Sequence, residues 1–120
     1  MRTGVFPGAL QIIPVIILFI TVVYGKSGAE RPTENPFQNN ESARAAGQKL
    51  FARHCAECHG PTAEGTERAP SLREFVRSAA PRALHTFIKN GNLRSGMPSW
   101  SRLPDPQLWQ LVTYLQTLEP

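Results

Sequence analysis

Cysteine and methionine are scarce in this sequence, with two residues of each type among 120. Two cysteines exclude a disulfide-rich scaffold, in which several bridges replace a hydrophobic core. Strand signals, repeats and low-complexity tracts are also lacking, so the sequence predicts an all-α fold. The formal net charge of +4 is too small for nucleic acid binding, which requires a clustered basic surface.

The chain after the N-terminal segment lacks a strong excess of either charge. From Glu30 onward, eleven Lys and Arg residues face nine Asp and Glu residues. This balance predicts a mixed, solvated surface with a weak preference for an acidic docking partner. That part has about 80 to 90 residues, a size at which a core alone is only marginally stabilising. A buried cofactor would add the missing stability.

The N-terminal segment is apolar, and residues 5–24 contain no charge. Arg2 precedes it, and Ser27 and Ala29 provide small residues at the −3 and −1 positions of a cleavage site. This pattern predicts a secretory signal peptide over residues 1–29, cleaved after Ala29. An uncleaved membrane anchor is the alternative, because about 20 apolar residues just span a bilayer core. Either way, we expect the rest of the chain on the periplasmic side of the cytoplasmic membrane.

Residues 30–41 contain two prolines, three asparagines and no apolar period. This composition predicts a flexible tether. One domain, expected to be monomeric, then occupies residues 42–120.

Four helices are predicted within that domain. The first runs to about His54 with Ser42 or Asn40 as its cap, and shorter helices follow over 72–78 and 81–89. The last has Asp105 as its cap and an apolar face that continues to residue 118. Residues 92–103 are predicted to be a loop. Gly47 interrupts the first helix, which indicates that another helix approaches closely there.

The run Cys55-Ala56-Glu57-Cys58-His59 is typical of covalent haem c attachment. Two cysteines three positions apart reach the two vinyl groups of a porphyrin, and the adjacent histidine reaches the iron. Three alternatives use the same residues. A thioredoxin-like pair needs a βαβ context, a structural zinc site needs a second ligand pair, and a disulfide leaves the histidine unexplained. Haem attachment fits best with the export segment and the helical pattern.

Met97 is the candidate for the second axial ligand. It lies 38 residues after His59, between Gly96 and Pro98, on a segment where no helix crowds it. His/Met pairing is the arrangement of electron carriers. His85 is the rival ligand, although it falls within a predicted helix. His54 is expected to be a surface residue beside the haem crevice.

These motifs together resemble a class I monohaem c-type cytochrome over about residues 42–118. The resemblance implies a small helical domain wrapped around one haem. It implies that the carbonyl of Pro70 accepts a hydrogen bond from His59, that Leu72 lines the haem crevice, and that Gly47 and Phe51 pack against the last helix. The propionate-binding set is not evident, with Trp100, Arg94 and Arg73 as candidates.

The expected function is electron transfer by iron in one covalently bound haem c, with no enzymatic activity, because His59 and Met97 fill both axial positions. The expected partners are redox proteins such as a dehydrogenase or terminal oxidase, with membrane contact through residues 5–24 if the anchor is kept. One alternative is a haem c subunit fixed in a membrane-bound dehydrogenase or oxidase complex. A ligand-binding haem sensor is a further alternative, and it would require an open axial site.

Overall fold

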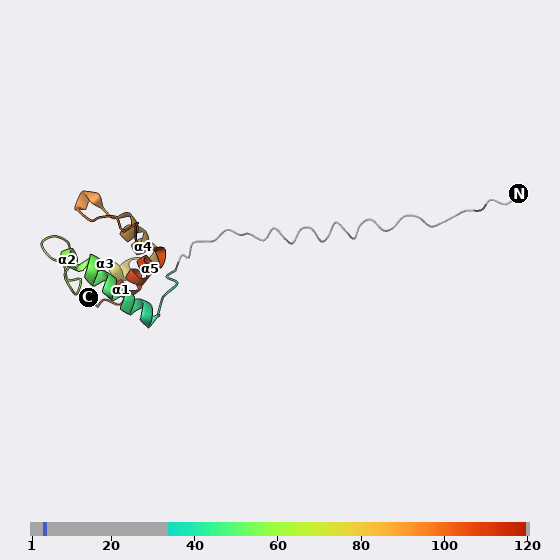
Figure 1. The fold of residues 1–120 in the computed structure, drawn as a ribbon, viewed down its shortest axis with the longest axis horizontal. Coiled ribbons are helices and arrows are strands. Elements are labelled where there is room, and N and C mark those ends of the chain that lie inside the picture. The colour runs from blue at the N-terminus through green and yellow to red at the C-terminus, as the bar shows by residue number, and fades with distance from the viewer. Residues whose placement is uncertain (1–3, 5–33, 120) are drawn as a thin grey trace. The chain divides into compact units, whose positions relative to one another are not determined.

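The computed structural model describes Gly4 and residues 34–119 (Figure 1). The predicted signal peptide or anchor, residues 1–29, therefore lies outside the described residues except for Gly4. Among the described residues, no helix is long and apolar enough to cross a membrane.

The described domain is built from helices, which confirms the predicted all-α class. The order is α1 (Glu41–His54), α2 (Ala56–His59), α3 (Arg73–Ser78), α4 (Pro81–Asn90), the 3-10 helix η2 (Leu93–Ser95) and α5 (Asp105–Leu115). Within residues 34–119 the β-type pairing is limited to one isolated antiparallel bridge, between Asn92 and Met97. Four of these elements match the predicted helices. The short helix α2 and the 3-10 helix η2 were not predicted.

The start of helix α1 is set by its N-cap residue, Asn40. The side chain of Asn40 accepts a hydrogen bond of 2.9 Å from the backbone N–H of Ala43, so Asn40 is the N-cap and Ser42 lies inside the helix. Glu41 adds a favourable negative charge in the first turn. The helix ends at His54, and the N–H of Cys55 still bonds to the carbonyl of Phe51 at 2.8 Å. The haem-attachment motif thus starts directly at the end of α1.

The predicted cap of the last helix is wrong. Pro104 occupies the N-cap position of α5, and Asp105 is the first helical residue. Its carboxylate lies instead 3.1 Å from Nε2 of His85 and 3.7 Å from Nζ of Lys89. A tertiary contact to α4 has therefore replaced the local capping bond that the sequence favours.

Helices α1 and α5 pack tightly against each other, crossing close together in Figure 1. A Cβ atom at Gly47 would lie 2.0 Å from the carbonyl oxygen of Gln110 and 2.9 Å from Cβ of Tyr114, so only glycine fits. The rings of Phe51 and Tyr114 meet with centroids 5.4 Å apart. The predicted close approach at Gly47 is confirmed. The hydrophobic core extends from this contact to residues of the other elements, namely Ala63, Val76, Leu84, Ile88, Leu108, Trp109, Leu111, Val112 and Leu115.

The predicted flexible tether is wrong for residues 35–40. Asn35 is buried, and its side chain donates a hydrogen bond of 2.9 Å to Oγ1 of Thr113 on α5. Its own Oδ1 accepts from the N–H of Phe37 at 2.9 Å, and Phe37 packs against the core. Asparagine side chains form such local turns readily, and here the turn gained a tertiary partner. The segment therefore belongs to the domain.

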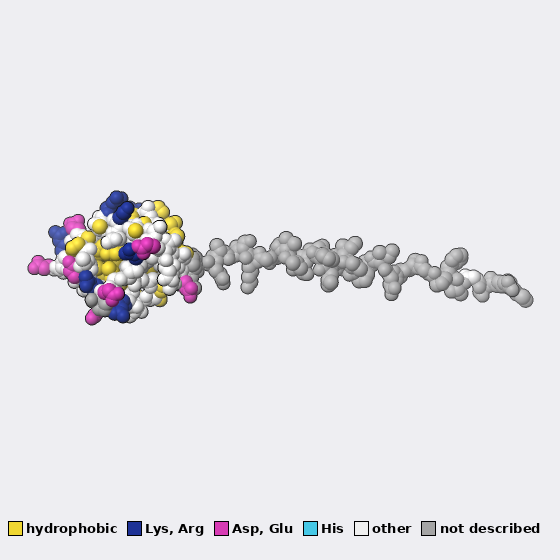
Figure 2. Space-filling model, turned by 90° about the horizontal axis from the view of Figure 1, so that it is seen from below, with side chains coloured by type: hydrophobic (Ala, Val, Ile, Leu, Met, Phe, Trp, Pro, Cys, Tyr) yellow, Lys and Arg dark blue, Asp and Glu magenta, His cyan; other side chains and the backbone are white. Residues whose placement is uncertain are grey.

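The surface carries charges of both signs, as the composition predicts. Figure 2 shows Lys and Arg side chains near Asp and Glu side chains, with hydrophobic side chains between them. Two of the acid–base contacts are the ion pair of Arg44 with Glu41 and the 2.8 Å pair of Arg68 with Glu57. Such exposed pairs each contribute little stability.

The α1–α5 contact gives a direct test of the packing. Substituting Gly47→Ala should destabilise the domain by about 3 kcal/mol, because the new methyl group meets backbone that has no space to yield. Gln48→Ala, an exposed change on the same helix, should alter stability by less than about 0.5 kcal/mol. Chemical denaturation of both variants measures the difference. A Gly47→Ala variant as stable as the parent would contradict the close approach.

Candidate functional site

An apolar cleft of about 480 Å³ opens in the helical domain. Residues of α1, α3, α4 and α5 form its walls, together with the segments that join them. The apolar lining includes Phe51, Ala69, Pro70, Leu72, Phe75, Val76, Leu84, Phe87, Ile88, Met97, Pro98, Trp100, Leu111 and Leu115. Leu72 therefore lies where the resemblance puts it. A cleft this apolar suits a large, flat hydrophobic group.

Both cysteines and the histidine of the attachment motif line this cleft. Cys55 stands between α1 and α2, and the single turn of α2 carries Cys58 and His59. Gly60 ends that turn with φ +82°, a conformation that favours glycine. Both thiols are free. Burial raises the pKa of the Cys55 thiol to about 11, and the neighbouring Cys58 adds to the rise, so Cys55 is protonated at neutral pH in the haem-free chain.

His59 is oriented by the loop that follows α2. Its Nδ1 lies 3.0 Å from the carbonyl oxygen of Pro70. A carbonyl only accepts, so Nδ1 carries the proton and Nε2 keeps its lone pair for a metal. The loop is closed by a 2.8 Å bond from the N–H of Thr66 to the carbonyl of Ala69, and Gly65, with φ +89°, lets the backbone pass close to Ser71. This is the contact that the resemblance implies for Pro70.

Met97 reaches the same cleft from a small hairpin. The N–H of Asn92 bonds to the carbonyl of Met97 at 2.9 Å, and the N–H of Met97 bonds to the carbonyl of Asn92 at 3.0 Å. Gly96 takes the left-handed conformation at φ +80° that closes the turn. Beyond the hairpin, Oγ of Ser99 donates to the carbonyl of Lys89 at 2.8 Å, which ties the segment to the end of α4. The segment predicted to be a loop is therefore held by hydrogen bonds within the hairpin and to the end of α4.

Of the polar residues proposed for propionate binding, the structure brings only Trp100 to the cleft. Its ring lies 5.0 Å from that of His54, which also lines the cleft, and the guanidinium of Arg102 lies 5.6 Å from its centroid. Arg73 is directed elsewhere, with Nε donating to the carbonyl of Thr62 at 3.1 Å. Arg94 is not among the residues that line the cleft.

Arg68 is a cleft residue that the sequence reasoning missed. It is the one arginine or lysine among the described lining residues. Arg68 could have been predicted from its position two residues before Pro70. The loop that brings Pro70 to His59 also brings the adjacent residues of the chain to the cleft.

His85 lies outside the cleft lining. It is buried, stacks on the ring of Trp109 at a centroid distance of 4.3 Å, and contacts Asp105 at 3.1 Å. Burial lowers the pKa of His85, and the Asp105 carboxylate, which acts in the opposite direction, offsets only part of the shift. The structure thus gives His85 a place in the core between α4 and α5, apart from Met97 and His59.

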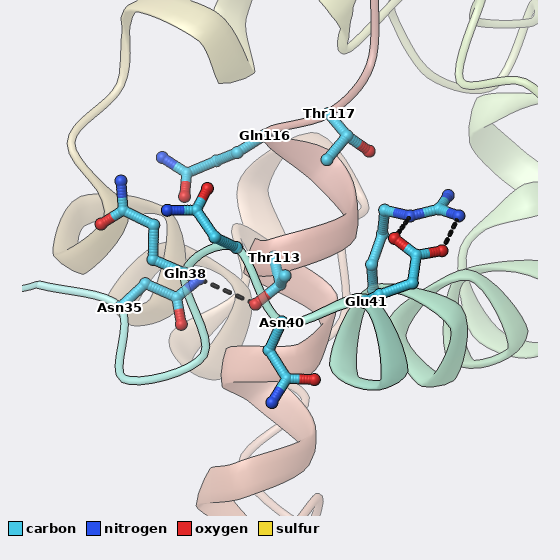
Figure 3. A pocket seen from close by; sticks show the side chains of 9 residues that line it. Asn35, Gln38, Asn40, Glu41, Thr113, Gln116 and Thr117 are labelled. Carbon is cyan, nitrogen blue, oxygen red and sulfur yellow. Dashed lines mark hydrogen bonds and ion pairs between the residues drawn. The ribbon is translucent and has the colours of Figure 1, made fainter.

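A second cavity, of about 510 Å³, is lined by polar and charged residues (Figure 3). The turn over residues 35–40 meets the start of α1 and the end of α5 there, and Figure 3 shows the bond of Asn35 to Thr113 beside it. Asn, Gln, Thr, Glu and Arg side chains line it, without Cys, His or Met. This cavity therefore lacks the thiol, imidazole and thioether side chains that haem c attachment and ligation use.

The apolar cleft fits a haem c group in its donor set. Two thiols stand three positions apart on one wall, an imidazole with a free Nε2 stands beside them, and a thioether reaches the same space from the hairpin. No group of three or more His, Cys, Asp or Glu side chains within residues 34–119 is arranged to bind a metal ion. The family model of cytochrome c oxidase, cbb3-type, subunit III matches residues 42–115. The chain belongs to this family.

Two relatives carry related names. The cbb3-type cytochrome c oxidase subunit CcoP of Rhodobacter capsulatus is 34% identical over 92 residues, covering 66% of this chain and 30% of the relative. The subunit FixP of Bradyrhizobium sp. (strain ORS 278) is 30% identical over 116 residues, covering 81% of this chain and 39% of the relative. This member of the cbb3-type subunit III family therefore spans well under half the length of the relatives that it matches.

Solved structures show the same fold. Cytochrome cL from Methylophaga aminisulfidivorans superposes with a TM-score of 0.63 at 24% identity, covering 81% of this chain and 72% of that one. The c-type cytochrome KustC0563 superposes with a TM-score of 0.55 at 22% identity, covering 62% of this chain and 98% of that one. With the family match, this confirms a monohaem c-type cytochrome whose cofactor is covalently bound haem c.

The buried His85 generates a prediction about pH. Because its pKa is lower in the folded chain, the unfolded chain binds a proton first as the pH falls. Stability should therefore be full above about pH 6.5, the unfolded value, and should decrease as the pH falls towards the folded-state pKa. In the His85→Gln variant, the part of the decrease in stability that comes from protonation of His85 should be absent. Unfolding curves measured between pH 8 and 5 give the free energy of unfolding of both proteins. The same pH dependence in both would contradict the prediction.

Proposed function

We propose that this chain is an electron-transfer domain in which Cys55 and Cys58 hold haem c through thioethers and His59 and Met97 are its axial ligands. The observation that carries the proposal is that His59 and Met97, from segments 38 residues apart, both line one apolar cleft with the two cysteines. When bound, haem c supplies one-electron Fe(III)/Fe(II) chemistry, and His/Met ligation favours a raised potential.

The residues of the chain prepare the cleft for that role. Pro70 fixes the tautomer and ring orientation of His59, and such a bond to a ligating histidine raises its basicity. The Asn92–Met97 bridge fixes the backbone from which the thioether would reach the iron. Buried side chains such as Phe51, Val76 and Leu111 exclude water from the inner wall. If His59 and Met97 both held the iron, no position on the metal would be left for a substrate, which supports a carrier rather than an enzyme or a ligand sensor.

For partners, we favour a place within a terminal oxidase complex over a free carrier or a dehydrogenase subunit. The support is that the relatives CcoP and FixP are named as subunits of cbb3-type cytochrome c oxidase. The segment that carries Met97 adds a charge argument. Residues 88–104 contain Lys89, Arg94 and Arg102 but no Asp or Glu. A positive segment of this kind is complementary to an acidic surface on the protein that exchanges electrons with it.

For location, we propose the periplasmic side of the cytoplasmic membrane, on the strength of the apolar N-terminal segment. Mass spectrometry of the mature protein from the native membrane fraction distinguishes a cleaved signal peptide from a retained membrane anchor. Cleavage after Ala29 should give a chain that starts at Glu30 and is released by washing. A retained anchor should give the full-length mass plus haem and require detergent for extraction. A full-length chain found in the cytoplasm would contradict both forms.

The ligand assignment is tested in protein produced together with haem-maturation factors. The oxidised parent should show a weak sulfur-to-iron charge-transfer band. Met97→Ala should abolish this band and lower the reduction potential by about 0.1 V or more, within the roughly 0.8 V range that axial ligands set. Visible spectroscopy and redox titration measure both effects.

His85→Gln is the matched control, since His85 lies outside the cleft, and it should leave band and potential in place. The band surviving in Met97→Ala would overturn the assignment of Met97. The variant with both Cys55→Ser and Cys58→Ser should lose covalent haem, seen as loss of the haem mass in the denatured protein. Covalent haem in that variant would overturn the attachment.

A further inference from the structure

The distal segment, residues 92–103, carries Met97 and is bonded to the rest of the described chain through α4. The N–H of Trp100 bonds to the carbonyl of Ile88 at 3.3 Å, and the hydroxyl of Ser99 bonds to another carbonyl of α4 at 2.8 Å. The other hydrogen bonds of the segment join its own residues. None of these bonds fixes how far the distal segment lies from the attachment motif.

Within residues 34–119, one aromatic contact joins the distal segment to α1. The ring of Trp100 meets the ring of His54 with centroids 5.0 Å apart and an angle of 50° between the planes. His54 is the last residue of α1 and directly precedes Cys55. Both rings are half-buried and line the apolar cleft. This ring contact therefore connects the helix that precedes the attachment motif with the segment that carries Met97.

Both rings of this contact are presented by packed parts of the domain. Trp100 packs against the hydrophobic core, and the guanidinium of Arg102 lies 5.6 Å from the centroid of its ring, as in a cation–π contact. His54 is carried by α1, which packs along α5. Little conformational entropy is therefore lost when the two rings meet.

The other aromatic pair that lines the cleft has a different position. The rings of Phe75 and Phe87, with centroids 6.2 Å apart, join α3 to α4. Neither ring belongs to α1 or to the distal segment. Among the aromatic contacts of the described chain, only the pair of His54 and Trp100 can therefore restrain the distal segment relative to α1.

We infer that the ring contact between His54 and Trp100 holds the distal segment closed over the cleft, so that His54 is a positioning residue for Met97. This inference rests on the proposed role of Met97 as an axial ligand. Opening of the distal segment breaks the ring contact, so the contact favours the closed state by about fivefold, the typical contribution of one aromatic pair. Helix α1 then sets the position of the second axial ligand as well as that of the cysteines.

The test measures how readily the distal segment opens in the haem-loaded protein. Imidazole replaces a methionine ligand when the segment opens, and a spectral titration of the ferric protein gives its dissociation constant. In His54→Ala, imidazole should bind about fivefold more tightly, because the closed state has lost the ring contact. The backbone N–H groups of Met97 and Trp100 should exchange with deuterium about fivefold faster, whereas those of α5 should keep their rates.

Three further variants test whether the ring contact is the cause. His54→Phe keeps an aromatic ring and should restore the imidazole affinity and the exchange rates of the parent. In a Trp100→Leu background, His54→Ala should have no further effect, because the partner ring is already absent. Arg53→Ala, an exposed change one residue earlier on α1, is the matched control and should behave like the parent.

The outcomes separate the ring contact from the ligand assignment. Met97→Ala should bind imidazole far more tightly than the parent; if it does not, the ligand assignment fails, and the exchange rates alone then decide the role of His54. If Met97→Ala behaves as expected and His54→Ala matches the parent, the role of His54 is overturned alone. The same conclusion follows if His54→Phe behaves like His54→Ala. Tighter imidazole binding in His54→Ala without faster exchange would also overturn it, because His54 would then act on the haem and not on the segment.

Discussion

The contact between α1 and α5 is the constraint on which the rest of the domain depends. Gly47 allows the backbone of α5 to approach α1, and the Phe51–Tyr114 ring contact extends that approach along the helices. Helix α1 ends at His54, so its position sets where Cys55 begins the attachment motif. Helix α5 contributes Leu111 and Leu115 to the wall of the same cleft. One helix pair therefore determines both the position of the attachment motif and part of the wall of the cleft.

Two loops from separate parts of the sequence complete the site, and both are held by backbone hydrogen bonds. The loop after α2 delivers the Pro70 carbonyl to His59, and the hairpin after α4 delivers Met97. Each depends on a glycine at positive φ, Gly65 in the first and Gly96 in the second. Both loops also contribute residues to the lining of the cleft, among them Leu72 and Met97.

Much of this arrangement could be predicted from the sequence where the signals are local. A few neighbouring residues are enough to recognise the attachment motif, the glycine of α1 and the apolar period of α5. The signals that failed depend on partners far away in sequence. The sequence around Asn35 predicts a tether, because its hydrogen-bond partner Thr113 is 78 residues away. The sequence around Asp105 predicts a helix cap, because its partners His85 and Lys89 belong to the distant helix α4. Arg68 reaches the cleft only because the loop closes over Pro70.

The two sides of the cleft differ in how they are built into the domain. His59 follows α1, whose packing against α5 belongs to the cooperative core. The hairpin of Met97 is closed by contacts between residues 92 and 97 and by bonds to the end of α4, and Leu93 at its turn is 78% exposed. Segments with local contacts and little burial open at lower free energy than the core around them. The hairpin that carries Met97 should therefore open at a lower free energy than the packed pair of helices α1 and α5.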